Sequence, residues 1–521
     1  MKKIRKNCLV LDEFDDNQKK YWFDLKNNNF VHNIDTFYYS IKLSEDFTEG
    51  THDKKVIRFR RYIQSILSLN YDEARQVGIE GCDDFVATHS GYGKYYSIRI
   101  SSPELFDFFV APVVPPGADG GQSVTSEIIV QLRSYLLWMS GPQEAFKISL
   151  EKIKVFLDYF DLHIYDIKEN RIDYCWHSNY LENPEKFFNI ENFVKMQVSH
   201  FRGVSYHYSF RQNLEYENDY VALGKRSDKI FVRIYLKSKE VVEMGYKPWF
   251  IKYWYDHKLI SLYDEYVLEE AYLANSWKYC ETARLKWYSE YGSNPKYVNL
   301  CKQVIENHVI TNYQDIAALA DKLTPRITKI MNVEFQTMRK GTKNYILIPQ
   351  RIYSDSLTER VDMYFDNWPL VIEYLTHSVL RLVDDDENVP KTKRDYNNFW
   401  KMLRAASSSF QPECPEDQKL LRDYSRKLNS DFVKRRALHS IVSYGFYVKG
   451  INEDSPLDDC MNALLRLNDN DMVHMSSYKI KKAMTLNKKD FDGQIDDKKS
   501  DLILNDFVIL NKNTGELYES E

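Results

Sequence analysis

The stretch Asp219–Glu243, DYVALGKRSDKIFVRIYLKSKEVVE, contains the strand that we expect the fold to be built around. Side chains of a strand alternate between its two faces, so the central part separates into two sets. One face carries Ile230, Val232, Ile234 and Leu236, and the other carries Phe231, Arg233, Tyr235 and Lys237. A tyrosine between two cations is a candidate nucleophile for phosphate chemistry. The plain alternative is a half-buried strand with a solvated basic face.

Two earlier segments alternate in the same way. In SEIIVQLRS the polar set is Glu127, Gln131 and Arg133, and in RIDYCWH it is Arg171, Asp173 and His177. If these strands are neighbours of the Tyr235 strand, one sheet face collects carboxylates, an imidazole, guanidinium groups, an ammonium and a phenol. That set suits a phosphodiester, although an antiparallel sheet with one wet face also explains polar residues at these positions.

Helical periodicity surrounds these strands. PQEAFKISLEKIKVFLDYF has apolar residues at helical intervals and is expected to cover the apolar sheet face, and the chain past Gly245 is mostly helical. We therefore predict an α+β fold, with an antiparallel sheet, helices packed on one face and a mostly helical C-terminal region. The predicted domains are a mixed region at 1–120, a core at 121–295, a helical accessory region with a short strand at 296–385, a helical domain at 386–485 and a charged tail at 486–521.

Composition narrows the class of protein. The chain has 521 residues, of which 43% are hydrophobic and 28% charged, as in a folded protein of several domains. No apolar run approaches the roughly 18–20 residues that span a bilayer, and we expect a cytoplasmic protein. Its seven scattered cysteines form no CxxC pair, which fits reduced thiols and gives no zinc framework. The net charge of −5 means that nucleic acid must be bound by local patches.

Three of the pieces, taken in order, resemble the transesterase replication initiators of rolling-circle plasmids and mobile elements, a family related to the HUH endonucleases that includes relaxases. These are the strand around Gln131, the Arg171-Ile172-Asp173 strand, and the glycine-containing segment Leu223-Gly224 followed by RIYLK at 233–237. The resemblance covers about Ser126 to Glu243. At the position of Gln131 the family has an acidic residue, so the chain departs from the pattern there.

The resemblance implies an enzyme with an HUH-like nickase core that nicks one strand at a DNA origin, keeps the 5′ end as a phosphotyrosine and frees a 3′-OH. Tyr235 would be the nucleophile, with Arg233 and Lys237 stabilising phenolate or binding the flanking phosphates. A divalent metal, Mg²⁺ or Mn²⁺, would polarise the phosphate. Its candidate ligands are Asp173, Gln131, Glu127 and His177. Asp173 could instead form a structural salt bridge with Arg171 or Arg233, and a lone histidine is more often a satisfied core residue.

The candidate DNA contacts are Lys225, Arg226, Arg171 and Arg133, with Gly224-Lys225-Arg226 predicted as a turn before the nucleophile strand. The expected partner is origin DNA, single-stranded or cruciform, together with a host helicase and polymerase; a homodimer is also considered, and no membrane is expected. Two other functions stay open. One is a non-catalytic DNA-binding or assembly protein of a mobile element, and the other is an interaction scaffold built on the helical half.

Overall fold

The computed structural model describes residues 30–410 and scattered residues after them. Within that range it leaves out 71–72, 104, 118–122, 124, 200, 202–203, 211–215, 245–246, 343–344, 347–355, 387 and 407. The chain divides into two compact units, 1–421 and 422–521. All of the elements that position the candidate site lie in the first unit. Among the described residues, no helix is long and apolar enough to cross a membrane.

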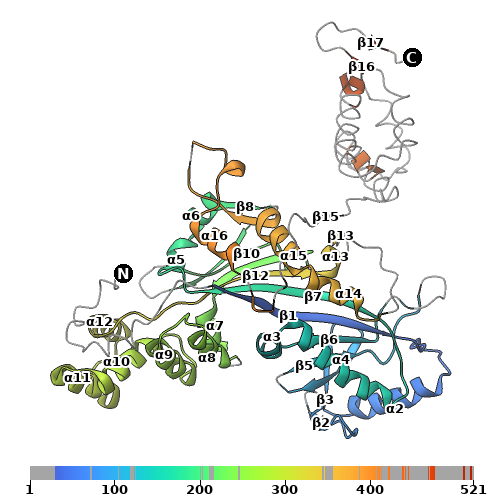
Figure 1. Ribbon diagram of the computed structural model, residues 1–521, viewed down its shortest axis with the longest axis horizontal. Coiled ribbons are helices and arrows are strands. Elements are labelled where there is room, and N and C mark those ends of the chain that lie inside the picture. The colour runs from blue at the N-terminus through green and yellow to red at the C-terminus, as the bar shows by residue number, and fades with distance from the viewer. Residues whose placement is uncertain are drawn as a thin grey trace. The chain divides into compact units, whose positions relative to one another are not determined.

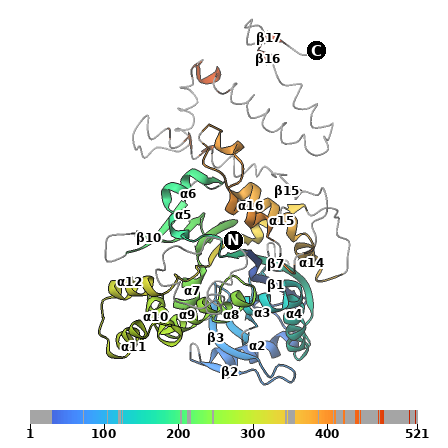
Figure 2. The same cartoon turned by 60° about the vertical axis from the view of Figure 1, so that its left-hand side comes forward.

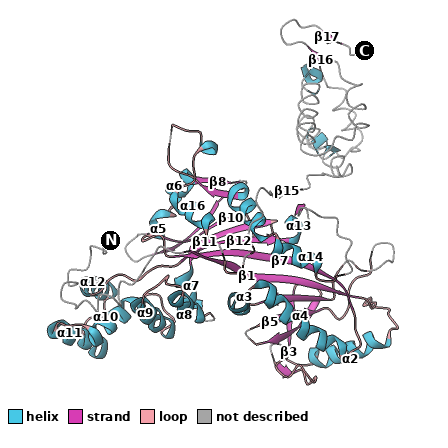
Figure 3. Ribbon diagram, viewed as in Figure 1, coloured by secondary structure: helices cyan, strands magenta, loops and turns pink. Residues whose placement is uncertain are grey.

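An eleven-stranded sheet forms the centre of the first unit (Figures 1 and 3). Every neighbouring pair of its strands is antiparallel. The strands are, in sheet order, β2 (Ala74–Gln76), β3 (Val86–Tyr92), β4 (Tyr96–Ser102), β5 (Phe106–Val110), β6 (Ile128–Leu132), β1 (Phe30–Leu43), β7 (Ile164–Ser178), β12 (Met331–Met338), β11 (Ile230–Leu236), β10 (Tyr216–Leu223) and β9 (Val204–Phe210).

Helices make up much of the rest of the described chain. They are α2 (Lys54–Leu67), α3 (Ser134–Ser140), α4 (Pro142–Asp158), α5 (Pro184–Phe187), α6 (Ile190–Met196), α7 (Lys237–Met244), α8 (Trp249–Asp256), α9 (Leu262–Leu273), α10 (Tyr279–Tyr291), α11 (Pro295–Asn307), α12 (Tyr313–Leu323), α13 (Arg339–Thr342), α14 (Glu359–Asp366), α15 (Trp368–Tyr374) and α16 (Asn398–Ala405), with the short helical segments η3 (Leu375–Val379) and η4 (Lys391–Lys393). Short strand pairs are β8 (Gln197–Ser199) with β14 (Leu380–Leu382), β13 (Tyr345–Ile346) with β15 (Leu421–Arg422), and β16 (Ile509–Leu510) with β17 (Leu517–Tyr518). The α+β prediction is confirmed.

The apolar face of the sheet is covered by helices, as the sequence predicts. Phe37 of β1 packs edge-on against Phe146 of α4, with ring centroids 6.1 Å apart, and against Phe365 of α14 at 5.4 Å. Trp368 of α15 contacts His32 of β1 at 5.3 Å. The helix α4 begins at Pro142. The N–H of a first helical residue has no hydrogen-bond partner within the helix, so a proline there costs no hydrogen bond.

The strands that carry the predicted polar residues are in one sheet but are not adjacent. β1 lies between β6 and β7, and β12 lies between β7 and β11. Both inserted strands come from parts of the sequence outside the predicted core of 121–295. The sheet therefore extends across the boundaries placed at 120 and 295, because pairing with distant segments buries the backbone groups that β6, β7 and β11 would otherwise leave open. The other domain boundaries stay predictions.

The helical segment after β11 is more divided than its sequence pattern indicates. The run from Leu262 to Gly292 contains no proline and its pattern is that of one long helix, but Asn275, with φ of 48°, separates α9 from α10. A residue in the left-handed conformation commonly ends a helix, and asparagine is one of the residues that adopt this conformation. Figures 1 and 2 show α9–α12 gathered beside α7 and α8, away from α2 and α4.

The turn between β10 and β11 depends on Gly224. Its φ is 81°, and a Cβ added there would lie 2.9 Å from Phe201 Cε1 and 3.2 Å from the Ile230 carbonyl oxygen. We expect Gly224→Ala to lower the free energy of unfolding by about 1–3 kcal/mol, because the left-handed backbone and the contact are both unfavourable for alanine. Denaturant titration measures the loss, with Gly50→Ala as the control, because a Cβ at Gly50 meets nothing within 4 Å. Equal values for the two variants would contradict the prediction.

Candidate functional site

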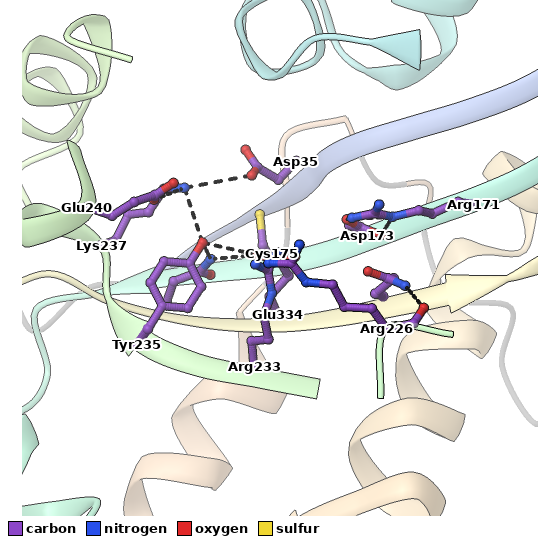
Figure 4. A network of polar contacts seen from close by, with 12 residues as sticks. Asp35, Arg171, Asp173, Cys175, Arg226, Arg233, Tyr235, Lys237, Glu240 and Glu334 are labelled. Atoms are coloured by element: carbon purple, nitrogen blue, oxygen red, sulfur yellow. Dashed lines mark hydrogen bonds and ion pairs between the residues drawn. The ribbon is translucent and has the colours of Figure 1, made fainter. Parts of the chain in front are cut away.

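The hydroxyl of Tyr235 lies in a network of hydrogen bonds on the polar face of the sheet (Figure 4). It donates to Glu334 Oε2 at 3.1 Å, and it accepts from Asn332 Nδ2 at 2.9 Å and from Lys237 Nζ at 3.3 Å. Tyr235 comes from β11, Asn332 and Glu334 come from β12, and Lys237 is the first residue of α7. Two strands and a helix therefore meet at one phenol.

Lys237 is fully buried and is held by acidic groups on two sides. Its Nζ lies 2.6 Å from Glu240 Oε2 and 3.8 Å from Asp35 Oδ2, and Lys247 Nζ lies 3.2 Å from the same Asp35 oxygen. Trp138 Nε1 donates to the other Asp35 oxygen at 3.2 Å. The prediction that Lys237 lies on the strand is wrong, because β11 ends at Leu236 and Lys237 is the first residue of α7. Its ammonium group still reaches the phenol.

The electrostatics of the cluster favour a charged Lys237 and a neutral Tyr235. Burial alone would lower the pKa of Lys237, but the charges of Asp35 and Glu240 hold it well above its ordinary value. The pKa of Asp35 is lowered: burial would raise it, but the cations Lys237 and Lys247 prevail. Burial and then the charge of Glu240 raise the pKa of Tyr235 well above 10.0, against the opposing effect of Lys237. The phenol therefore keeps its proton at neutral pH unless a base removes it.

Arg233 supports this arrangement from the neighbouring position on β11. Its guanidinium forms an ion pair with Glu334 Oε1 and lies 5.6 Å from the centroid of the Tyr235 ring. Glu334 is 1% exposed, so this ion pair is largely shielded from solvent on the carboxylate side. The three predicted catalytic residues, Tyr235, Arg233 and Lys237, are brought together by the structure. Their catalytic roles stay a prediction.

Asn332, Glu334 and Asp35 were not among the predicted site residues. The segment MNVEFQTM carries the period-two signal, since Asn332, Glu334 and Gln336 alternate with apolar residues at 333 and 335. It lies in the region 296–385, which was predicted as helical with one short strand, and no strand was predicted at this segment. Asp35 carried no comparable signal, because β1 has a register irregularity between Ile34 and Thr36, where the alternation breaks.

Asp173 forms the salt bridge that the sequence analysis left open as its alternative role. Arg171 Nε donates to Asp173 Oδ1 at 2.8 Å, and a second guanidinium nitrogen pairs with Oδ2. Asp173 is 1% exposed, and burial raises its pKa above the ordinary value, although Arg171 opposes the shift. Asp173 and Tyr235 share a face, but β7 is two strands from β11, and the register puts Asp173 level with Phe231, four residues from Tyr235. Their backbones are therefore about 16 Å apart.

Gln131 and Arg133 lie farther from the phenol. β6 is four strands from β11, a separation of about 19 Å at the usual strand spacing. Arg133 makes a two-pronged ion pair with Asp107 of β5, with its Nε 3.0 Å from Oδ2 and a terminal nitrogen 2.8 Å from Oδ1. The expectation that Gln131 is a neighbour of Tyr235 is wrong, because β1, β7 and β12 lie between their strands.

Glu127 and His177 are each engaged elsewhere. Glu127 forms an ion pair with Lys42 and accepts from the Leu43 backbone at 2.8 Å. His177 is buried, stacks on Trp138 at 4.7 Å and accepts a hydrogen bond from Trp254 Nε1 at 3.3 Å. Burial lowers the pKa of His177 well below 6.5, so its imidazole is neutral.

The four predicted metal ligands do not converge on one point. By strand register Glu127 is level with Asp166, about 23 Å along β7 from Asp173, and His177 is about 13 Å from Asp173 in the other direction. No group of three metal-ligating side chains occurs in the described part of the chain. The carboxylates around the phenol are already engaged: Glu334 pairs with Arg233, and Asp35 and Glu240 pair with Lys237. The residues as arranged do not fit a divalent cation, and a metal cofactor stays a prediction from the resemblance.

Of the predicted DNA contacts, Lys225 and Arg226 are exposed in the turn before β11. The turn is closed by Asp228, whose carboxylate accepts from the Lys225 backbone at 2.7 Å. Gln336 Nε2 donates to the Arg226 carbonyl at 2.9 Å, which ties the turn to β12. Arg171 and Arg133 are half-buried on the polar face, and each is paired with an aspartate.

Comparison with known proteins gives structural likeness but no match at the level of sequence. No family model matches the chain, and no curated protein matches it. Among solved structures, the rolling circle replication initiator protein from Geobacillus stearothermophilus is similar over 74% of this chain and 100% of its own, at 12% identity and a TM-score of 0.33. A likeness at that TM-score does not establish the family or the activity, so a function has to be argued from the site.

Proposed function

We propose that this protein is a rolling-circle replication initiator that nicks one strand of origin DNA and holds the 5′ end as a phosphotyrosine on Tyr235. The observation that carries the proposal is the placement of the Tyr235 hydroxyl, which has Lys237, Asn332 and Glu334 within 3.3 Å of it on a polar sheet face. An ordinary solvated strand face has no need to surround one phenol with a buried lysine and a buried carboxylate.

The cations next to the phenol support phosphate chemistry. Lys237 stays charged because Asp35 and Glu240 hold its proton, so it can stabilise the oxygen that attacks phosphorus. Arg233 is half-buried, and its planar donor set lies 5.6 Å from the centroid of the Tyr235 ring. Transfer to a tyrosine conserves the phosphodiester bond energy, so no nucleotide cofactor is needed.

The main alternative is a non-catalytic DNA-binding or assembly protein of a mobile element. The pairing of Arg171 with Asp173 and of Arg133 with Asp107 favours it, since paired arginines can be purely structural. It accounts less well for Lys237, because apolar residues of similar volume often stabilise a fold as well as a buried ion pair does.

The test is to look for a covalent adduct. The full chain is incubated with single-stranded and cruciform DNA from a library of origin-like sequences, labelled on both sides of each cut, with Mg²⁺, with Mn²⁺ and with chelator. We expect an adduct that retains the fragment on the 3′ side of the cut, whose new 5′ phosphate is bonded to Tyr235, and peptide mass spectrometry should locate it there. DNA that is bound without any adduct supports the alternative, and an adduct on another residue overturns the assignment to Tyr235. The chelated sample shows separately whether a metal is required.

A further inference from the structure

We infer that Glu334 is the general base of this site, accepting the proton of Tyr235 as the phenol attacks phosphorus. The inference rests on the proposed function and adds a catalytic residue to it. The hydrogen bond from Tyr235 Oη to Glu334 Oε2 is 3.1 Å long, within the reach expected of a catalytic base. Nothing in the strand pattern around Tyr235 pointed to this residue.

Of the three groups hydrogen-bonded to the phenol, only one can take a proton. Lys237 is a charged donor, and the amide nitrogen of Asn332 also donates to the phenol. A carboxylate is the single acceptor in the set. Asn332 Nδ2 lies 3.3 Å from Glu334 Oε2 as well, so the same amide holds both partners of the proton transfer in place.

A base is needed here because the phenol does not ionise readily. Burial and the charge of Glu240 raise the pKa of Tyr235 well above 10.0. A phenolate formed by solvent alone would therefore be scarce at neutral pH. Transfer to a bonded carboxylate during attack avoids forming a free phenolate in this buried place.

Other charged or titratable groups face Glu334 from the strands on both sides of it. They are Arg233 and Tyr235 of β11 and Arg171, Asp173 and Cys175 of β7. Lys237 of α7 reaches the phenol itself. Arg233 binds Glu334 Oε1, so Oε2 is the oxygen left to face the phenol. The arginine thereby acts as a positioning residue that fixes which oxygen takes the proton.

The step balances as a transesterification. The proton of Tyr235 Oη moves to Glu334, the Oη–P bond forms, and the P–O3′ bond breaks. The electron pair of the broken bond goes to the 3′ oxygen, which takes a proton from water, and Glu334 then returns its proton to the hydroxide so formed. No oxidant, reductant or nucleotide is consumed.

The test is the pH dependence of single-turnover adduct formation by wild-type protein and Glu334→Gln, on a DNA that the wild type cleaves. We expect the wild-type rate to reach a plateau near neutral pH, whereas the variant is slower by about 10²-fold or more and its rate rises tenfold per pH unit. Glu334→Ala should regain part of its rate when formate is added, which a purely structural role would not allow.

The outcomes separate the two proposals. If wild-type protein forms no adduct on Tyr235, the proposed function fails. If it does, and Glu334→Gln keeps the wild-type rate and pH profile, only the assignment of Glu334 fails. If the variants do not fold, the wild-type profile decides, because a rate that rises tenfold per pH unit up to pH 9 without a plateau overturns the inference.

Discussion

Tyr235→Phe will abolish the covalent adduct, with a loss of at least about 10³-fold in the rate of DNA cleavage, because phenylalanine has no oxygen to attack phosphorus. The ring still fills the same place beside Arg233 and Lys237, so the fold should survive. The hydroxyl's bonds to Glu334 and Asn332 are lost, which should cost about 1–3 kcal/mol of unfolding free energy. Adduct yield is measured on a denaturing gel, and stability by denaturant titration.

The control for this variant is Tyr165→Phe, which removes a phenol that is 59% exposed at the start of β7. It should leave both adduct yield and stability unchanged. DNA binding by Tyr235→Phe, measured at low salt, should stay within a few-fold of wild type. An adduct formed by Tyr235→Phe at the wild-type rate would remove Tyr235 from the chemistry altogether.

The second large effect is expected from Lys237→Met. This change removes the cation from a fully buried position while Asp35 and Glu240 remain, and breaking one side of a buried ion pair typically costs about 3–5 kcal/mol. Lys247 still neutralises part of the charge on Asp35, so we place the loss near the lower end of that range. Denaturant titration at neutral pH measures it.

The matched control is Lys252→Met, which breaks an exposed i,i+4 ion pair with Asp256 in which the lysine side chain is 72% exposed. Its cost should be below about 1 kcal/mol, as for surface ion pairs in general.

At acid pH the difference in unfolding free energy between Lys237→Met and wild type should become smaller. The pKa of Asp35 is lowered in the folded state, so its stabilising contribution is present at neutral pH and is lost as the pH falls through that lowered value. Equal stability of Lys237→Met and Lys252→Met would show that the buried network does not stabilise the fold.

The local pattern of the sequence predicted much of the fold. Alternation at Ile230–Leu236 and at Arg171–His177 identified β11 and the second half of β7, and the spacing in 142–160 identified α4. These predictions succeed because alternation between faces and helical spacing are properties of a short segment. The same alternation placed Arg233 and Tyr235 together on one face, as the structure shows.

Pairing between distant segments could not be predicted in this way. β11 pairs with β12 and not with β7, through backbone hydrogen bonds between residues about a hundred positions apart. Pairing over such a separation leaves no pattern in the local sequence of either strand. That choice brings Glu334 and Asn332 to the phenol and keeps Gln131 four strands away. It also places Asp35 beside Lys237, across a segment of about two hundred residues. The sequence by itself determined the strand, its polar face and the tyrosine on it; only the tertiary structure decided which base and which carboxylates surround that tyrosine, because partners in a sheet are chosen by long-range pairing and burial.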